Sequence, residues 1–120
     1  MRNYLKLLVI DDEKDICQLL KRMLSKYYEE IQIGHTLEDA MRLLKEHNPD
    51  HLLLDNNLPD GEGVKIIKTC KAFSPELKVI VFSAMDIHEE AITSGADSFI
   101  SKPIYLPNLL RALQAKTALR

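Results

Sequence analysis

The chain has 120 residues, 46% hydrophobic and 28% charged, which is long enough for one domain with a hydrophobic core but not for two. We therefore predict a single domain over residues 1–120. Its formal net charge of -2, without a basic stripe, argues against nucleic-acid binding. Its apolar runs fall short of the ~20 residues that cross a bilayer, and its start lacks a signal peptide's apolar segment, so we expect a cytoplasmic protein without membrane contact.

Short apolar runs alternate with helix-like patterns along the chain. We predict these runs to be β-strands, over residues 5–10, 31–34, 51–54, 78–82 and 98–100. The first, third and fourth are almost continuously apolar, as expected for strands buried on both faces, whereas the second alternates and fits an edge. Repeated strand–helix alternation indicates the α/β class, with a doubly wound, five-stranded parallel sheet and helices on both faces.

The first three helices are predicted from apolar residues at helical spacing. A first helix is expected within residues 16–27, and Thr36 can cap a second, which must stop near Asn48–Pro49. Asp60–Gly61 predicts a tight turn before a third helix that includes residues 64–71.

The last two helices are predicted mainly from their ends. Asp86 followed by Glu89 resembles a capping box for a fourth helix, and Gly95 is suited to its C-terminus. Pro107 suits the first turn of a fifth helix, whose apolar residues lie within residues 109–113.

Polar residues follow four of the five predicted strands. Asp11 and Asp12 follow the first strand and Asp55 the third, while Ser83 and Lys102 follow the fourth and fifth. Each alone is typical of a turn residue, a helix cap or a solvated side chain. In parallel sheets, however, ligands bind beyond the carboxyl ends of the strands. The convergence of all five residues at that edge therefore predicts a functional site.

The chemistry of these residues points to a phosphoryl group. Neighbouring carboxylates repel each other, so each tends to hold a proton unless a cation is present. Oxygen ligands without nearby histidine or cysteine favour a hard cation, Mg²⁺ first and Mn²⁺ second. Lys102 and the Ser83 hydroxyl remain as donors to an anion. Asp55, alone on the central strand, is the best candidate nucleophile, because a carboxylate can form an acyl phosphate.

Over nearly its whole length, the chain resembles the receiver domains of response regulators in two-component signalling, which are chemotaxis-Y-like. The motifs that carry this resemblance are VIDDE, DNNLPDGEG, the Ser83–Ala84 pair, and Lys102–Pro103 with its prelude GADSFISKP. The resemblance implies a flavodoxin-like fold of five β/α units with strand order 2-1-3-4-5. It also implies a phosphorylation-activated signalling switch.

The resemblance assigns a role to each residue of the cluster. Asp55 would accept a phosphoryl group from a kinase phosphohistidine. Asp12 and Asp55 would bind Mg²⁺ directly with the backbone carbonyl of Asn57, and Asp11 would act mainly through a coordinated water. Lys102 would pair with Asp55 before phosphorylation and with a phosphoryl oxygen afterwards.

Further roles concern the switch and the lifetime of the phosphate. The Ser83 hydroxyl would move to a phosphoryl oxygen, and Phe99 would be the switch aromatic that turns inward, although core packing alone also requires an aromatic there. The Lys102–Pro103 bond is expected to be cis. Asn57 and Met85 match the positions that tune phosphate lifetime, and we hypothesise that dephosphorylation depends more on Asn57. Output would come from the fourth helix, fifth strand and fifth helix.

The resemblance also implies the partners. These are a sensor histidine kinase or a histidine phosphotransfer protein, and a downstream protein that the sequence does not name. The chain would be a monomer or a phosphorylation-dependent dimer, either stand-alone or part of a longer regulator. It would not be a conventional enzyme, because it would catalyse only its own phosphorylation and autodephosphorylation.

Two alternatives remain. One is a non-phosphorylated docking module, which the complete set of five site residues counts against. The other is a metal-dependent phosphohydrolase of the haloacid-dehalogenase type, which carries an acid two residues after the nucleophile. Here that residue is Asn57, which cannot act as a general acid/base in that way.

The cysteines and histidines show no metal-ligand spacing. We expect Cys17 and Cys70 to be reduced thiols. We expect the four histidines to be solvated or to cap helices: His35, His47, His51 and His88.

Overall fold

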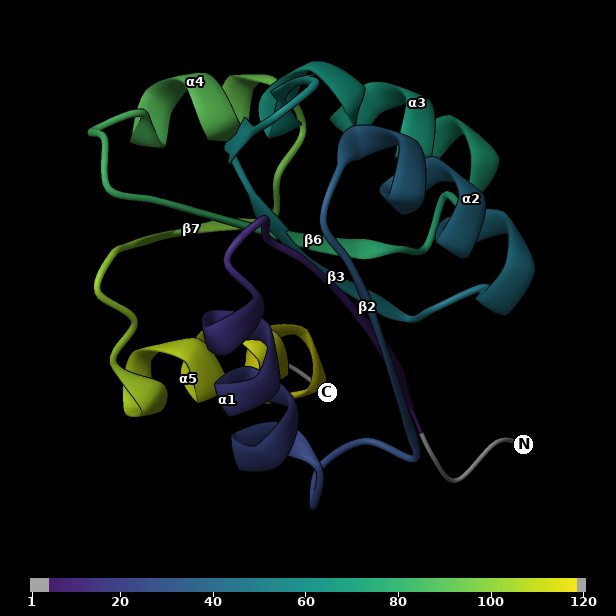
Figure 1. Ribbon diagram of the computed structural model, residues 1–120. Helices are drawn as coiled ribbons and strands as arrows, with labels where there is room; N and C mark the ends of the chain where they lie inside the picture. The colour runs from purple at the N-terminus through teal and green to yellow at the C-terminus, as the bar shows by residue number, and fades with distance from the viewer. Residues whose placement is uncertain (1–4, 119–120) are drawn as a thin grey trace.

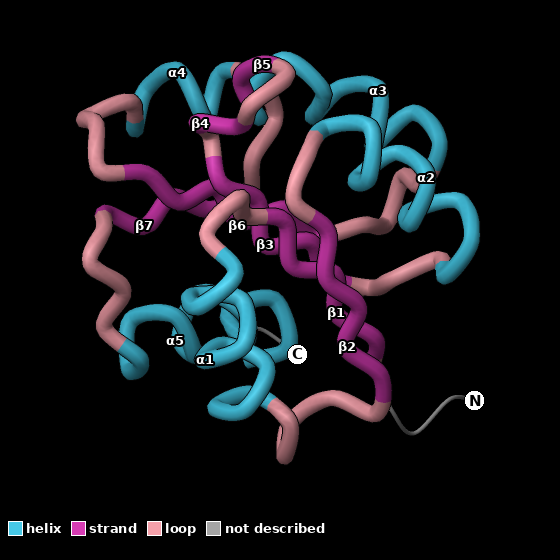
Figure 2. The backbone as a smooth tube through the Cα atoms, in the orientation of Figure 1, coloured by secondary structure: helices cyan, strands magenta, loops and turns pink. Residues whose placement is uncertain are grey.

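The computed structural model describes residues 5–118 and is built around a five-stranded parallel sheet (Figures 1 and 2). The strands are β1 (Lys6–Ile10), β2 (Glu30–Gly34), β3 (His51–Asp55), β6 (Lys78–Ser83) and β7 (Ser98–Ser101). Their order is β2-β1-β3-β6-β7. In terms of the five predicted strands this order is 2-1-3-4-5, so the predicted fold class and strand order are confirmed.

Helices cover both faces of the sheet (Figure 1). One face carries α1 (Lys14–Leu24) and α5 (Leu106–Ala118), and the other carries α2 (Leu37–His47), α3 (Ile67–Phe73) and α4 (His88–Thr93). Each face has its own apolar core. Side chains alternate along β3, so Leu52 and Leu54 point into one core and Leu53 into the other. Burial on both faces explains why the central strands are almost continuously apolar.

Several predicted helix ends are present. The Thr36 side chain caps α2 by accepting a hydrogen bond from the Asp39 N–H at 2.9 Å. The C-terminus of α2 is formed by Asn48 in the left-handed conformation, with φ +49°. Gly95, with φ +110°, follows α4, and Pro107 lies in the first turn of α5. These positions confirm the predicted boundaries.

Other predictions at helix ends were wrong. Asp86 does not cap α4, because Ile87 occupies the N-cap position and no side chain within residues 5–118 provides a cap. The backbone first makes a turn in which the Ile87 N–H donates to the Met85 carbonyl, and this turn delays the helix. The first helix ends at Leu24, so Tyr27 lies beyond it with its side chain 37% exposed.

A small hairpin follows β3 (Figure 2). Its strands are β4 (Asn57–Leu58) and β5 (Gly61–Glu62), and a short 3₁₀ helix, η1 (Gly63–Ile66), leads from it into α3. The predicted tight turn at Asp60–Gly61 closes this hairpin, where Gly61 has φ +147°. Across the described residues, no helix has both the length and the apolarity that crossing a membrane requires.

Candidate functional site

Three carboxylates lie together at the carboxyl ends of the central strands. One carboxylate oxygen from each of Asp11, Asp12 and Asp55 lies within 4.8 Å of the other two. They meet because β1 and β3 are neighbours, so the loop after Ile10 lies beside the end of β3. Asp11 and Asp55 are buried, at 0% and 2% exposed, whereas Asp12 is exposed. Two desolvated carboxylates thus lie behind a third that is open to solvent.

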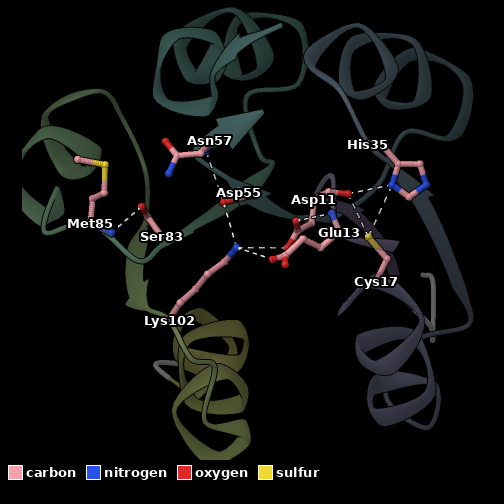
Figure 3. Close-up of polar contacts among 9 residues, drawn as sticks. All are labelled: Asp11, Glu13, Cys17, His35, Asp55, Asn57, Ser83, Met85 and Lys102. Atoms are coloured by element: carbon pink, nitrogen blue, oxygen red, sulfur yellow. Dashed lines mark hydrogen bonds and ion pairs between the residues drawn. The ribbon is translucent and has the colours of Figure 1, made fainter. Parts of the chain in front are cut away.

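Lys102 reaches this cluster from the end of β7 (Figure 3). Its Nζ atom lies 3.4 Å from Asp55 Oδ1, 3.5 Å from Asp11 Oδ2 and 3.7 Å from Glu13 Oε1. The Lys102–Pro103 peptide bond is cis. Sequence reasoning missed Glu13, although it is the third acid of the run that begins at Asp11.

Burial and charge shift the pKa values of the site. Burial and the neighbouring Asp11 carboxylate raise the pKa of Asp55 to about 6, against the opposing effect of Lys102. Burial alone lowers the pKa of Lys102, but the Asp55 and Asp11 carboxylates outweigh burial and raise it overall. At Asp55, burial and the neighbouring Asp11 carboxylate together therefore outweigh the effect of Lys102 on the pKa.

This donor set fits a hard divalent cation. The available ligands are carboxylate oxygens, which Mg²⁺ prefers to nitrogen and sulfur ligands. Asn57 lies at the start of the hairpin, and its N–H is 3.4 Å from Asp55 Oδ1. The start of η1, directly after the hairpin, is packed closely on the end of β3, since a Cβ atom at Gly63 would lie 2.5 Å from the Asp55 carbonyl oxygen. Glycine at this position lets the chain turn back beside the acids.

The remaining predicted residues lie at or just after the end of β6, in the hairpin after β3, and within β7. Ser83 is buried at the end of β6, and its Oγ atom accepts a hydrogen bond from the Met85 N–H at 3.0 Å. The Met85 side chain is 57% exposed, and Asn57 is also exposed. Phe99 is partly buried, and its ring packs edge-on against His88 with 5.7 Å between the ring centroids.

The prediction that every histidine is solvated or caps a helix was wrong. His51 is buried and hydrogen-bonds the Tyr28 hydroxyl at 2.6 Å. The Nδ1 atom of His35 lies 2.8 Å from the Asp11 carbonyl oxygen (Figure 3). His47 pairs with Glu30 at 2.9 Å. These contacts join different elements of the fold, so no local sequence pattern predicts them.

Both cysteines are buried free thiols, as predicted. Burial raises the pKa of each thiol to about 11. The Cys17 thiol donates to the same Asp11 carbonyl oxygen as His35, at 3.3 Å. The thiol therefore helps to hold the backbone of Asp11, a role that the sequence did not indicate.

Comparisons with known proteins agree with this geometry. The sequence model of the response regulator receiver domain matches residues 7–114. Response regulator MprA of Mycobacterium ulcerans is 29% identical over 113 residues, which are 92% of this chain and 49% of the relative. MprA of Mycobacterium tuberculosis is 27% identical with the same coverage. The chain thus spans about half the length of these curated relatives.

Solved structures show the same fold. A CheY-like receiver domain protein from Methanospirillum hungatei superposes with a TM-score of 0.87 at 25% identity, covering 95% of this chain and 94% of that one. The BeF3-activated receiver domain of DrrB gives 0.83 at 27% identity, with coverages of 98% and 99%. With the family model matching almost the whole sheet and its helices, the chain belongs to the response regulator receiver domain family, whose general function is phosphorylation-dependent signalling.

Proposed function

We propose that residues 1–120 form a single receiver domain that is switched by phosphorylation of Asp55. The donor would be a phosphohistidine of a sensor histidine kinase or of a histidine phosphotransfer protein. The observation that carries this proposal is the convergence of Asp11, Asp12 and Asp55 with Lys102 at one edge of the sheet. The BeF3-activated form of the DrrB receiver domain supports it by analogy.

The carboxylates would hold Mg²⁺, with Mn²⁺ as an alternative. Asp12 and Asp55 would bind directly with the backbone carbonyl of Asn57, and Asp11 would bind mainly through water. When bound, the ion would neutralise charge on the phosphoryl oxygens during transfer. Because the three acids repel one another, a bound cation would stabilise the cluster.

The transfer is a displacement at phosphorus. A carboxylate oxygen of Asp55 forms the new P–O bond while the P–N bond to the donor imidazole breaks, and the leaving nitrogen takes a proton from solvent. The Lys102 ammonium, now 3.4 Å from Asp55, then pairs with a phosphoryl oxygen. The domain processes only its own phosphoryl group, so it is a switch and not a conventional enzyme.

The switch would begin at Ser83. Its hydroxyl, now bonded to the Met85 N–H, would turn to a phosphoryl oxygen and draw the loop after β6 with it. Phe99 would leave its contact with His88 and turn inward. The surface of α4, β7 and α5 would change as a result and bind a downstream protein. Phosphate drives this change because Ser83 and Lys102 contact it differently in the two states.

The first test is direct phosphorylation. The protein is incubated with Mg²⁺ and acetyl phosphate, and we expect an acid-stable, base-labile adduct. The adduct should be absent in Asp55→Asn and retained in Asp97→Asn, which alters a carboxylate at the opposite edge of the sheet. Wild-type protein without an adduct would support the docking module instead. Steady turnover of varied phosphate esters would support the phosphohydrolase.

A second test concerns the lifetime of the phosphate. Asn57 offers an amide that can orient an attacking water, whereas the Met85 side chain has no strongly polar group. We expect Asn57→Ala to change the decay of the phosphorylated protein more than Met85→Ala does. Equal or reversed effects on the decay rate would contradict this assignment.

A further inference from the structure

We propose that the junction between β2 and α2, residues 35–38, positions both loops that carry the candidate Mg²⁺ ligands. The first loop is residues 11–13, and the second is the hairpin of residues 57–62. In this proposal His35 and Asp60 are positioning residues, which act on the metal site through the backbone. The inference rests on the proposed function, because it concerns the same Mg²⁺ site.

The first loop is tied to the junction through the peptide groups of Asp11. The Asp11 N–H donates to the Gly34 carbonyl at 3.1 Å, at the end of β2. The Asp11 carbonyl accepts from His35 Nδ1 at 2.8 Å and from the Cys17 thiol at 3.3 Å (Figure 3). Since a carbonyl only accepts, Nδ1 of His35 carries the hydrogen. Both the N–H and the carbonyl of Asp11 are thus hydrogen-bonded, which fixes the start of the first loop.

The second loop is tied to the junction by the carboxylate of Asp60. Its two oxygens accept from the first backbone N–H groups of α2, those of Leu37 at 2.8 Å and Glu38 at 3.1 Å. The turn also lies tightly against α2, since a Cβ atom at Gly61 would be 2.8 Å from Leu37 Cδ1. Asn57 pairs with Glu62 in this hairpin, so the position of its carbonyl depends on where the hairpin lies.

The junction itself is firmly held. The Asp39 carboxylate accepts from the His35 N–H at 2.9 Å, and the Thr36 hydroxyl accepts from the Asp39 N–H at 2.9 Å. The backbone before it is packed closely, because a Cβ atom at Gly34 would lie 2.7 Å from Asp39 Cβ. Both ligand loops are therefore hydrogen-bonded to one segment that is itself held by hydrogen bonds and close packing. Loss of either contact would let a ligand loop shift while the sheet remains folded.

The test is a calorimetric titration of the full chain with Mg²⁺ alone. Changes in the groups that orient metal ligands typically weaken affinity by 10- to 100-fold, and for contacts that act through the backbone we expect about tenfold in His35→Leu and Asp60→Ala. His35→Asn should recover most of the affinity, because its side-chain amide can place a donor near the position of Nδ1. Urea unfolding of each variant in EDTA gives its stability separately.

The matched controls remove similar contacts at the opposite edge of the sheet. His47→Leu removes a histidine that pairs with Glu30, and Asp97→Ala removes a carboxylate that accepts from the Val79 N–H. Both should lower the free energy of unfolding and leave the Mg²⁺ dissociation constant unchanged. A purely structural role of His35 and Asp60 would give the same result for them.

The outcomes separate the two proposals. If wild type binds Mg²⁺ and His35→Leu and Asp60→Ala bind it within twofold, the positioning role is overturned and the proposed function stands. If wild type binds no Mg²⁺, the proposed function fails. Because Asp60 is exposed, Asp60→Ala leaves the core intact and remains decisive even if His35→Leu does not fold.

Discussion

Buried polar groups have different kinds of partner at the two ends of the strands, which we call the amino edge and the carboxyl edge of the sheet. At the amino edge, where the strands begin, Lys78 is 4% exposed and its Nζ atom donates to the Leu113 carbonyl at 3.0 Å. His51, at 8% exposed, bonds the Tyr28 hydroxyl. The carboxylate of Asp97, which is exposed, also has partners there, because it accepts from both a backbone N–H and a lysine ammonium. Donors meet acceptors along this edge, so its polar groups stabilise the fold.

At the carboxyl edge, buried groups of like charge lie side by side. The Asp11 and Asp55 carboxylates are as deeply buried as any polar group of the amino edge, and Asp12 adds a third charge. The buried groups of the two edges are similarly buried, but their partners differ. Hydrogen-bonded partners stabilise the folded state, whereas neighbouring like charges destabilise it. The carboxyl edge therefore holds repulsion that a bound cation would relieve.

The largest effect is expected from removing the Lys102 ammonium group at the carboxyl edge. Lys102→Met leaves the Asp55, Asp11 and Glu13 carboxylates without their ammonium partner. Loss of one partner of a largely buried ion pair should lower the free energy of unfolding in EDTA by about 3 kcal/mol. Urea unfolding at pH 7.5 measures it, with Lys68→Met, an exposed lysine of α3, as the control near zero. Equal losses in the two variants would contradict the contrast.

The next effect has the opposite sign. Asp55→Asn removes a carboxylate. The pKa of this group in the folded protein is about 6, against an ordinary value of 3.8. Each unit of pKa shift corresponds to 1.36 kcal/mol, so the metal-free variant should be more stable than wild type by about 2–3 kcal/mol at pH 7.5. Denaturation in EDTA measures this gain, and Asp97→Asn at the amino edge should lose stability instead. A loss of stability in Asp55→Asn would refute strain at the carboxyl edge.

The same pKa fixes the pH dependence of that gain. Because the folded pKa lies above the unfolded value, the folded state binds more protons between about pH 3.8 and 6. The penalty from Asp55 is therefore complete above pH 6 and disappears as the pH falls through this window. The difference between wild type and Asp55→Asn should shrink toward zero near pH 4. A difference that stays constant over the window would show that charge is not its cause.

A smaller effect is expected at the amino edge. Tyr28→Phe removes the hydroxyl that bonds His51 and should lower the free energy of unfolding by about 1 kcal/mol. The Mg²⁺ dissociation constant should not change, because this pair lies at the opposite end of β3 from Asp55. Tyr27→Phe, in the neighbouring half-exposed tyrosine, is the control and should have a smaller effect. Weaker Mg²⁺ binding in Tyr28→Phe would show that the two edges are coupled.

The contrast also explains what could be predicted from the sequence. The continuous apolar runs before Asp11, Asp55 and Ser83 indicated buried parallel strands, and their carboxyl ends had to share one edge. The cluster followed from that geometry, because residues directly after a strand have little freedom in where they lie. Lys102 was placed for the same reason, at the end of the last strand.

The missed contacts depend on distances that no local pattern encodes. His35 reaches the Asp11 backbone, which presents the same carbonyl whatever the side chain, so residue types carry no signal of it. Asp60 caps a helix that begins 23 residues earlier in the chain, whereas capping patterns are local. Asp86 failed as a cap because a turn intervened before α4. Tertiary contacts of this kind appear only once the loops are placed.

The smallest change in stability, and a decisive change in binding, is expected from Asp12→Asn. Asp12 is exposed, so water screens its charge and the gain in metal-free stability should be smaller than for Asp55→Asn. Its carboxylate is nevertheless a proposed direct ligand, so Mg²⁺ binding should weaken by about tenfold or more. Calorimetric titration with Mg²⁺ and unfolding in EDTA measure the two quantities, with Asp15→Asn, an exposed acid of α1, as the control. If melting in EDTA and Mg²⁺ affinity are both unchanged in Asp12→Asn, Asp12 is not part of the site, and the repulsion at the carboxyl edge belongs to Asp11 and Asp55 alone.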